Sequence, residues 1–166
     1  MPGRFIAKQE LSTWPVFGIL AKLTRTIFIS RSSSSALKQL QLIAHLLFRS
    51  ERLILFPEGT SSDGRKVLPF KPSLFEAPIQ ADAIVQPLTI RYEKINGMPV
   101  DRRSKPFLAW YGDMDLLPHL WRSLSLGTIT IKLIFHKPIK ATLLGDRKEL
   151  ANYCQKIITF ESEKPD

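Results

Sequence analysis

Short, β-branched apolar runs alternate with longer segments of helical periodicity, and this alternation constrains the fold more than any other feature of the sequence. Residues 26–29 and 53–56 are rich in Ile, Leu and Phe, which predicts two buried strands. Between them, residues 36–48 place four apolar side chains on one helical stripe, namely Leu37, Leu40, Ala44 and Leu47. This strand–helix–strand order predicts an α/β fold with a mixed, mostly parallel central sheet covered by helices.

The same alternation continues to the end of the chain. It predicts strands at 84–92, 107–111 and 128–135 and helices at 73–80 and 146–160. Pro87 implies an edge, a bulge or a strand end within the first of these strands, and Asp146 is positioned to cap the last helix. The charged stretch 94–106 contains Pro and Gly and predicts a loop. Because no linker or internal repeat interrupts the pattern, residues 1–166 are expected to form a single domain.

The charge of the chain favours an acidic partner. There are 24 Lys and Arg against 15 Asp and Glu residues, a net charge of +9. Residues 1–83 carry 11 basic and 6 acidic side chains, and residues 84–166 carry 13 and 9, so the excess is spread over both halves. An anionic membrane surface or a phosphorylated ligand fits this distribution as well as nucleic acid does. Since no zinc-finger spacing or RNA-binding signature is present, no nucleic-acid partner is expected.

The apolar stretches of the chain are too short to cross a bilayer. The longest segment without a charged residue, Leu11–Ala21, has 11 residues. A signal peptide is also not expected, because the basic residues near the start are followed by Gln9 and Glu10. Residues 14–25 combine aromatic and aliphatic side chains with flanking Lys and Arg, which suits either an interfacial segment on anionic lipid or an ordinary core helix. We therefore expect a peripheral protein at the cytoplasmic face of a membrane.

The strand at 53–56 is followed by the segment whose side chains are best suited to bind a ligand. Glu58, Gly59 and Thr60 provide a carboxylate, a flexible backbone and a hydroxyl at the carboxyl end of a strand, where ligands bind in open α/β sheets. Residues 61–64 predict a tight polar turn, and Lys66 and Lys71 follow, where they could face an anionic group. The alternative is a strand that simply runs into a turn, with Glu58 solvated or capping.

Three blocks of the sequence resemble those of the glycerolipid acyltransferases, the 1-acyl-glycerol-3-phosphate acyltransferase group. Phe-Pro-Glu-Gly-Thr at 56–60, followed by Phe-Lys-Pro at 70–72, is similar to the third block of that family, although Ser61 stands where the family usually has arginine. Residues 5–31 resemble the second block, which ends in an arginine after a strand, and residues 84–88 resemble the fourth. The resemblance covers residues 4–92 directly.

The resemblance implies a reaction and a set of binding residues. Family members transfer a fatty acyl group from acyl-CoA or acyl carrier protein to the hydroxyl of a lysophospholipid, such as 1-acyl-glycerol-3-phosphate, in phospholipid biosynthesis, and no metal or other cofactor is expected. Arg31 corresponds to an arginine that holds the acceptor phosphate, for which a guanidinium is well suited. The remaining binding residues implied are Glu58, Gly59, Thr60, Lys71 and the shaping residue Pro87.

The catalytic base of the family is missing from these residues. The family uses His-Xaa4-Asp, whereas here the residues five positions after His45, His119 and His136 are Ser, Leu and Ala. His45 is expected to pack on its helix, and His136 to have a structural role. His119, which follows Pro118 near Asp113 and Asp115, is the first alternative base should the chain transfer acyl groups, although the family offers no precedent for it. Cys154 has no nearby histidine and offers no disulfide or multi-cysteine metal site. No catalytic residue is therefore predicted.

Three functions are consistent with a chain that has the binding blocks of the family and lacks its catalytic base. The favoured one is an acyltransferase shortened at its amino terminus and inactive as this chain. The second is a pseudoenzyme that binds a lysolipid, and the third is a basic nucleic-acid or protein interaction domain. A lyso-aminolipid is the alternative acceptor to 1-acyl-glycerol-3-phosphate, because a similar sequence would serve both.

Overall fold

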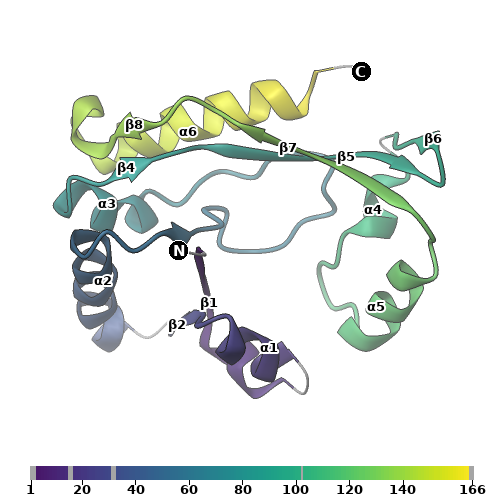
Figure 1. Cartoon of the computed structure of the whole chain (residues 1–166), viewed down its shortest axis with the longest axis horizontal. Coiled ribbons are helices and arrows are strands. Elements are labelled where there is room, and N and C mark those ends of the chain that lie inside the picture. Colours follow the sequence, from purple (N-terminus) through teal and green to yellow (C-terminus); the bar gives the residue numbers. More distant parts are fainter. Residues whose placement is uncertain (1–2, 15–16, 31–32, 102, 165–166) are drawn as a thin grey trace. The chain divides into compact units, whose positions relative to one another are not determined.

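The computed structural model describes residues 3–14, 17–30, 33–101 and 103–164, and Figure 1 labels its elements. The chain forms two compact units. The parallel unit comprises Met1–Pro57, Pro72–Val85 and Lys140–Leu150, and the antiparallel unit comprises Glu58–Lys71, Gln86–Ile139 and Ala151–Asp166. The chain therefore passes from one unit to the other five times, and neither unit is a continuous stretch of sequence.

The parallel unit contains a three-stranded parallel sheet with the order β2-β1-β3. Its strands are β1 (Arg4–Lys8), β2 (Ile27–Ile29) and β3 (Leu53–Ile54). The helical segments between them are η1 (Gln9–Thr13), α1 (Phe17–Leu23) and α2 (Ser33–Phe48). The predicted strands at 26–29 and 53–56 are thus confirmed, although the second is only two residues long.

The core of this unit shows which face of α2 is buried. Ile6 and Ile27 pair across the sheet and form a buried cluster with Leu46 of α2, against which Ile43 also packs. Leu37, at the start of the predicted stripe, is 64% exposed, so this part of the prediction is wrong. The other three positions of the predicted stripe agree with the structure, since Ala44 is 6% exposed and Leu40 and Leu47 are partly buried.

Shorter elements complete the parallel unit. They are η2 (Pro72–Phe75), α3 (Glu76–Gln80), β4 (Ile84–Val85), η3 (Ala141–Leu144) and the first turn of α6 (Arg147–Ser162). The predicted helix at 73–80 is confirmed as η2 and α3, with Pro78 in the first turn of α3, where a proline is tolerated. The predicted cap of α6 is also confirmed, since Asp146 Oδ1 accepts hydrogen bonds from the N–H groups of Lys148 and Glu149 at 2.7 and 2.9 Å.

The antiparallel unit contains a sheet with the order β6-β5-β7. Its strands are β5 (Leu88–Ile95), β6 (Met98–Pro99) and β7 (Ile129–Phe135), and its helices are α4 (Lys105–Leu108), α5 (Leu116–Leu124) and most of α6. The strand β8 (Ile139–Lys140) pairs with β4, and the boundary between the two units along the sequence falls within it. The predicted strand at 128–135 is confirmed, and the α/β class with parallel and antiparallel strand pairs is as expected.

Two sequence predictions in this unit are wrong. The expected loop at 94–106 contains a hairpin, because Asn96 and Gly97 both have positive φ angles and turn β5 directly into β6. The expected strand at 107–111 does not form, because Phe107 and Leu108 end the helix α4 and residues 109–111 have no regular secondary structure. Pro106 lies in the first turn of this helix, where its fixed φ and missing N–H favour a helix start.

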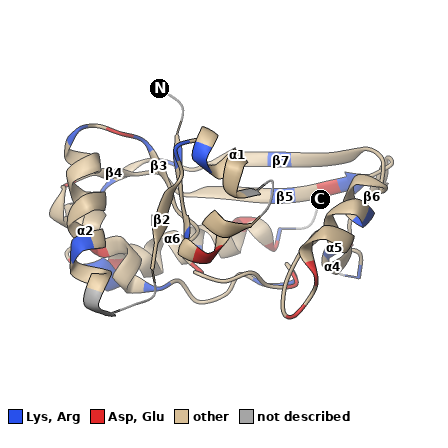
Figure 2. Cartoon of the chain, turned by 90° about the horizontal axis from the view of Figure 1, so that it is seen from below, with Lys and Arg blue, Asp and Glu red and all other residues tan. Residues whose placement is uncertain are grey.

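Pro87 interrupts the predicted strand at 84–92, as expected, and separates β4 from β5. The proline carbonyl accepts a hydrogen bond from the N–H of His136 at 3.0 Å. No helix of the described residues is long and apolar enough to span a bilayer. Lys and Arg residues occur on elements of both units (Figure 2), consistent with the even spread of charge along the sequence.

Candidate functional site

The candidate site is built on the segment Glu58–Lys71 of the antiparallel unit, which we call the Glu58 loop. Glu58 begins the loop, and its Oε2 accepts a hydrogen bond from the N–H of Leu68 at 3.1 Å. The side chain is partly buried, and this burial raises the pKa of the Glu58 carboxyl, while the Leu68 N–H lowers it to a lesser extent. The carboxylate thus closes the loop and keeps Oε1 available, since Oε1 has no hydrogen-bond partner among the described residues.

Gly59 brings the backbone of the loop into contact with Lys71. Its φ of +64° lies in the left-handed region, which favours glycine. A Cβ atom added at Gly59 would lie 2.9 Å from Lys71 Nζ and 3.0 Å from its Cδ, so the lysine side chain lies directly across this backbone. Lys71 and Thr60 are both exposed. The loop therefore presents the Glu58 carboxylate at one residue and, against the backbone of the next residue, Gly59, the ammonium group of Lys71.

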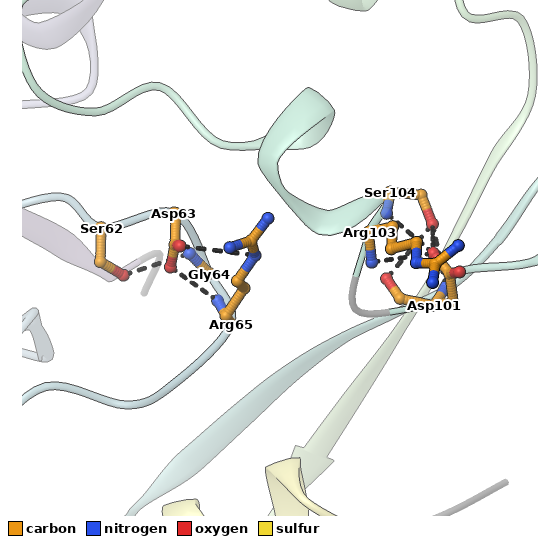
Figure 3. Close-up of polar contacts among 7 residues, drawn as sticks. All are labelled: Ser62, Asp63, Gly64, Arg65, Asp101, Arg103 and Ser104. Atoms are coloured by element: carbon orange, nitrogen blue, oxygen red, sulfur yellow. Dashed lines mark hydrogen bonds and ion pairs between the residues drawn. The ribbon is translucent and has the colours of Figure 1, made fainter.

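The polar turn predicted at 61–64 is confirmed (Figure 3). Ser62 Oγ accepts a hydrogen bond from the N–H of Gly64 at 3.3 Å, and Asp63 Oδ1 accepts one from the N–H of Arg65 at 3.0 Å. The guanidinium of Arg65 also forms an ion pair with Asp63, with Nε 3.6 Å from Oδ2. Arg65 is half-exposed, so this pair contributes little to stability. The arginine nearest to the position held by Ser61 is thus engaged within the turn.

A second polar cluster in Figure 3 has a structural explanation. Asp101 Oδ1 accepts hydrogen bonds from the N–H groups of Arg103 and Ser104, and from the Ser104 hydroxyl. These bonds, the Ser104 hydroxyl first, lower the pKa of the Asp101 carboxyl. The cluster forms the tight turn that precedes α4. It needs no ligand to account for it.

The far end of the Glu58 loop is attached to α6. Phe70 is buried, and its N–H donates a hydrogen bond to Gln155 Oε1 at 3.0 Å. Sequence reasoning missed both Gln155 and Leu68 as positioning residues. No sequence signal could have indicated Gln155, which lies 85 positions from its partner, and Leu68 acts through its backbone alone.

The structure brings together three of the six predicted binding residues, Glu58, Gly59 and Lys71. Thr60 is on the same loop with its side chain exposed. Pro87 is buried directly before β5, where its carbonyl accepts a hydrogen bond from the N–H of His136, and its shaping role stays a prediction. Arg31 lies outside the described residues, and its role in holding the acceptor stays a prediction.

The three histidines and the cysteine differ in their surroundings. His136 Nε2 is 2.8 Å from the hydroxyl of the buried Thr89, which confirms its structural role. His45 is exposed on α2, so the expectation that it packs is wrong. His119 Nδ1 is 3.5 Å from the Ser123 hydroxyl, and the described part of the chain offers it no carboxylate partner. Cys154 is buried, and burial raises the pKa of its thiol to about 11, so it remains protonated and unreactive at neutral pH.

Comparisons with known proteins bear on the family and the fold of the chain. A family model described as Acyltransferase matches residues 1–91. The chain is 41% identical over 155 residues to a lyso-ornithine lipid O-acyltransferase of Brucella abortus, covering 89% of this chain and 58% of that protein. It is 34% identical over 158 residues to a 1-acyl-sn-glycerol-3-phosphate acyltransferase of Neisseria gonorrhoeae, covering 95% and 60%.

A solved structure shares the fold. The crystal structure of the 1-acyl-sn-glycerophosphate acyltransferase from Thermotoga maritima superimposes with a TM-score of 0.63 at 22% identity, covering 97% of this chain and 56% of that one. The chain spans less than two thirds of the length of each of these relatives. At such identity, the structural comparison supports the α/β fold predicted from the sequence.

Proposed function

Because the chain belongs to the acyltransferase family, we propose that it serves in the transfer of a fatty acyl group from acyl-CoA or acyl carrier protein to the hydroxyl of a lysolipid. The observation that carries this proposal is the juxtaposition of Glu58, Gly59 and Lys71 in one loop. The free Glu58 oxygen can accept a hydrogen bond from an acceptor hydroxyl, and the Lys71 ammonium can pair with an anionic headgroup.

In the proposed reaction, the acceptor oxygen forms an ester bond with the acyl carbon while the thioester bond breaks. The hydroxyl proton passes to a base, and the donor leaves as a thiolate. No metal or further cofactor is needed for this exchange. The residues of this chain supply acceptor binding, and no His-Xaa4-Asp base is among them. We therefore expect the 166-residue chain alone to show no acyl transfer above background, since loss of a general base costs about 10²–10⁴-fold.

Two acceptors are proposed, and one observation favours each. The Phe-Pro-Glu-Gly-Thr block points to 1-acyl-glycerol-3-phosphate, which carries a phosphate. Ser61, in the position of an arginine, favours a headgroup without phosphate, and relatives with 41% and 37% identity are named lyso-ornithine lipid O-acyltransferases. Ornithine carries amine and carboxyl groups, which complement Glu58 and Lys71 respectively. Titration of the chain with both acceptors, each with a short acyl chain below its micellar concentration, would rank them.

The binding roles can be tested with charge-removing variants. Arg31→Ala and Lys71→Gln are expected to weaken acceptor binding by about ten- to a hundred-fold, the effect of losing one charge-assisted hydrogen bond, without lowering Tm. Lys66→Gln is the matched control, because Lys66 is also exposed on the Glu58 loop. Equal weakening in all three variants would indicate general charge attraction and contradict an acceptor site.

A membrane surface is the proposed location of the acceptor, and α1 is the proposed contact in the parallel unit. Ile19, Leu20 and Leu23 of α1 are 64%, 51% and 75% exposed, which favours the interfacial reading of this segment over the core-helix reading. Lys22 and Arg25 beside them are also exposed. Flotation with vesicles is therefore expected to increase when anionic lipid is added and to decrease with salt. Equal flotation with and without anionic lipid would contradict the binding of α1 to an anionic membrane surface.

A further inference from the structure

The helix α5 of the antiparallel unit exposes an apolar stripe that the site described above does not use. Leu117, Trp121 and Leu124 are 60%, 76% and 69% exposed. Their spacing of four and three residues places them on one side of a helix. A large exposed tryptophan between two exposed leucines is unusual on a helix surface, and it indicates a binding surface.

Another side of α5 is partly covered by the rest of the protein. Leu116, His119, Leu120 and Ser123 are partly buried and lie on a different side of the helix from the stripe. The stripe is therefore a second apolar face, left over after the helix has packed on its own unit.

The ends of α5 are held in place by hydrogen bonds. Before the helix, the indole N–H of Trp110 donates to the carbonyl of Met114 at 2.7 Å. After it, Asn96 Nδ2 donates to the carbonyl of Leu126 at 2.8 Å, and the N–H of Thr128 donates to Asn96 Oδ1 at 2.9 Å. Arg122 also lies over the ring of Phe107, 5.0 Å from its centre. These contacts present the stripe on a fixed support.

The size and composition of the stripe indicate what covers it. Three side chains expose on the order of 400 Å², about half of the roughly 800 Å² per partner that a stable protein interface buries. A bilayer interface needs no such area, because each inserted side chain gains independently, and tryptophan is favoured there. The charged residues between positions 109 and 127 are Asp113, Asp115 and Arg122, so this segment of the chain has no excess of positive charge to draw it to anionic lipid.

We infer that α5 inserts Leu117, Trp121 and Leu124 into the surface of a lipid bilayer, driven by apolar burial rather than by charge. The inference deepens the proposed function, on which it rests, because a lysolipid acceptor lies in such a surface. It also distinguishes α5 from α1. Binding through α5 should be the same on neutral and anionic lipid and in salt, whereas binding through α1, which is flanked by Lys22 and Arg25, should strengthen on anionic lipid.

The test uses the whole chain and vesicles of pure phosphatidylcholine, without lysolipid. A variant with Leu117→Gln, Trp121→Gln and Leu124→Gln is expected to bind these vesicles at least tenfold more weakly than the parent, with an unchanged circular dichroism spectrum. The control carries Leu37→Gln and Phe48→Gln on α2, which are 64% and 66% exposed. It is expected to bind as the parent does. Equal loss in both variants, or loss in neither, overturns the inference.

Two further measurements separate the remaining explanations. If the triple variant fails to fold, quenching by brominated phosphatidylcholine decides: Trp121→Phe should remove most of the quenchable fluorescence, and an unchanged quenching overturns the inference. Sedimentation without lipid reveals whether the parent is a dimer that the triple variant dissociates, which would assign the stripe to a second copy. Binding of a short-chain lysolipid should be the same in the triple variant and the parent, and its absence from both contradicts the proposed function while leaving the α5 surface intact.

Discussion

Glu58 is the residue whose protonation connects the site to the stability of the fold. Because burial raises its pKa above the ordinary 4.5, the folded chain holds this proton more tightly than the unfolded chain does. The carboxyl therefore stabilises the fold at low pH and loses this contribution as the pH rises through the raised pKa. Glu58→Gln should remove this pH dependence, which urea unfolding between pH 4 and pH 7 would measure.

Glu161 provides a control of opposite sign. Its hydrogen bond from Lys164 lowers the pKa of the Glu161 carboxyl, so its contribution is present above the ordinary pKa and is lost as the pH falls. The free energy of unfolding of the parent minus that of the variant should thus decrease with rising pH for Glu58→Gln. The same quantity should increase with rising pH for Glu161→Gln. Parallel curves for the parent and Glu58→Gln would show that the carboxylate is solvated.

Alanine substitutions at Gly59 and Gly97 distinguish the effect of backbone strain from the effect of contact with Lys71. Both have positive φ, so alanine at either position should cost about 1–2 kcal/mol of unfolding free energy. Only Gly59→Ala meets another group, because the added Cβ would press on the Lys71 ammonium, whereas nothing lies within 4 Å at Gly97. Acceptor binding should therefore weaken in Gly59→Ala alone. Similar acceptor affinities of the two variants would show that Lys71 does not contact the acceptor.

At the scale of elements, α6 depends on its cap. Asp146→Ala should lower Tm because two N–H groups of the first turn lose their partner. Asp115→Ala is the matched control, since Asp115 holds the same position before α5 without a side-chain cap bond. The bonds to the Glu149 and Lys148 N–H groups lower the pKa of the Asp146 carboxyl, so the stabilisation should disappear as the pH falls below 3.8. Equal changes in Tm for both variants would mean that the cap contributes nothing.

At the scale of the whole molecule, an apolar face of the antiparallel sheet is open to solvent. It consists of Ile90 and Tyr92 of β5 and Ile131, Leu133 and Phe135 of β7. These side chains are 39–64% exposed, and the register places them on the same side of the sheet. Patches of this kind bind apolar dyes and promote association.

Replacing part of this face should therefore reduce dye binding. Leu133→Thr with Phe135→Thr is expected to reduce the fluorescence of bound anilinonaphthalene sulfonate at least twofold and to change the unfolding midpoint little, because threonine keeps the strand propensity. Ile84→Thr in β4, at a position 72% exposed, is the control and should leave the fluorescence unchanged. A marked loss of stability in the double variant would show that this face is packed.

Much of the local structure follows from the sequence alone. The strands at 27–29 and 129–135, the helix α2, the cap at Asp146 and the polar turn at 61–64 were all predictable. Each depends on periodicity or on hydrogen bonds between residues at most a few positions apart. The grouping of Glu58, Gly59 and Lys71 was predicted only as a sequence block, from which a common ligand could be proposed but no distance.

The tertiary structure alone decided the features that depend on residues far apart in the chain. It brought Leu46 into the core beside the predicted stripe and left Leu37 exposed, attached Phe70 to Gln155 and closed the Glu58 loop on Leu68. It also left the second apolar side of α5 exposed. The sequence specifies that a helix has an apolar side because periodicity is local. Which side is buried depends on the partner that folding brings to it, and that partner is encoded elsewhere in the chain.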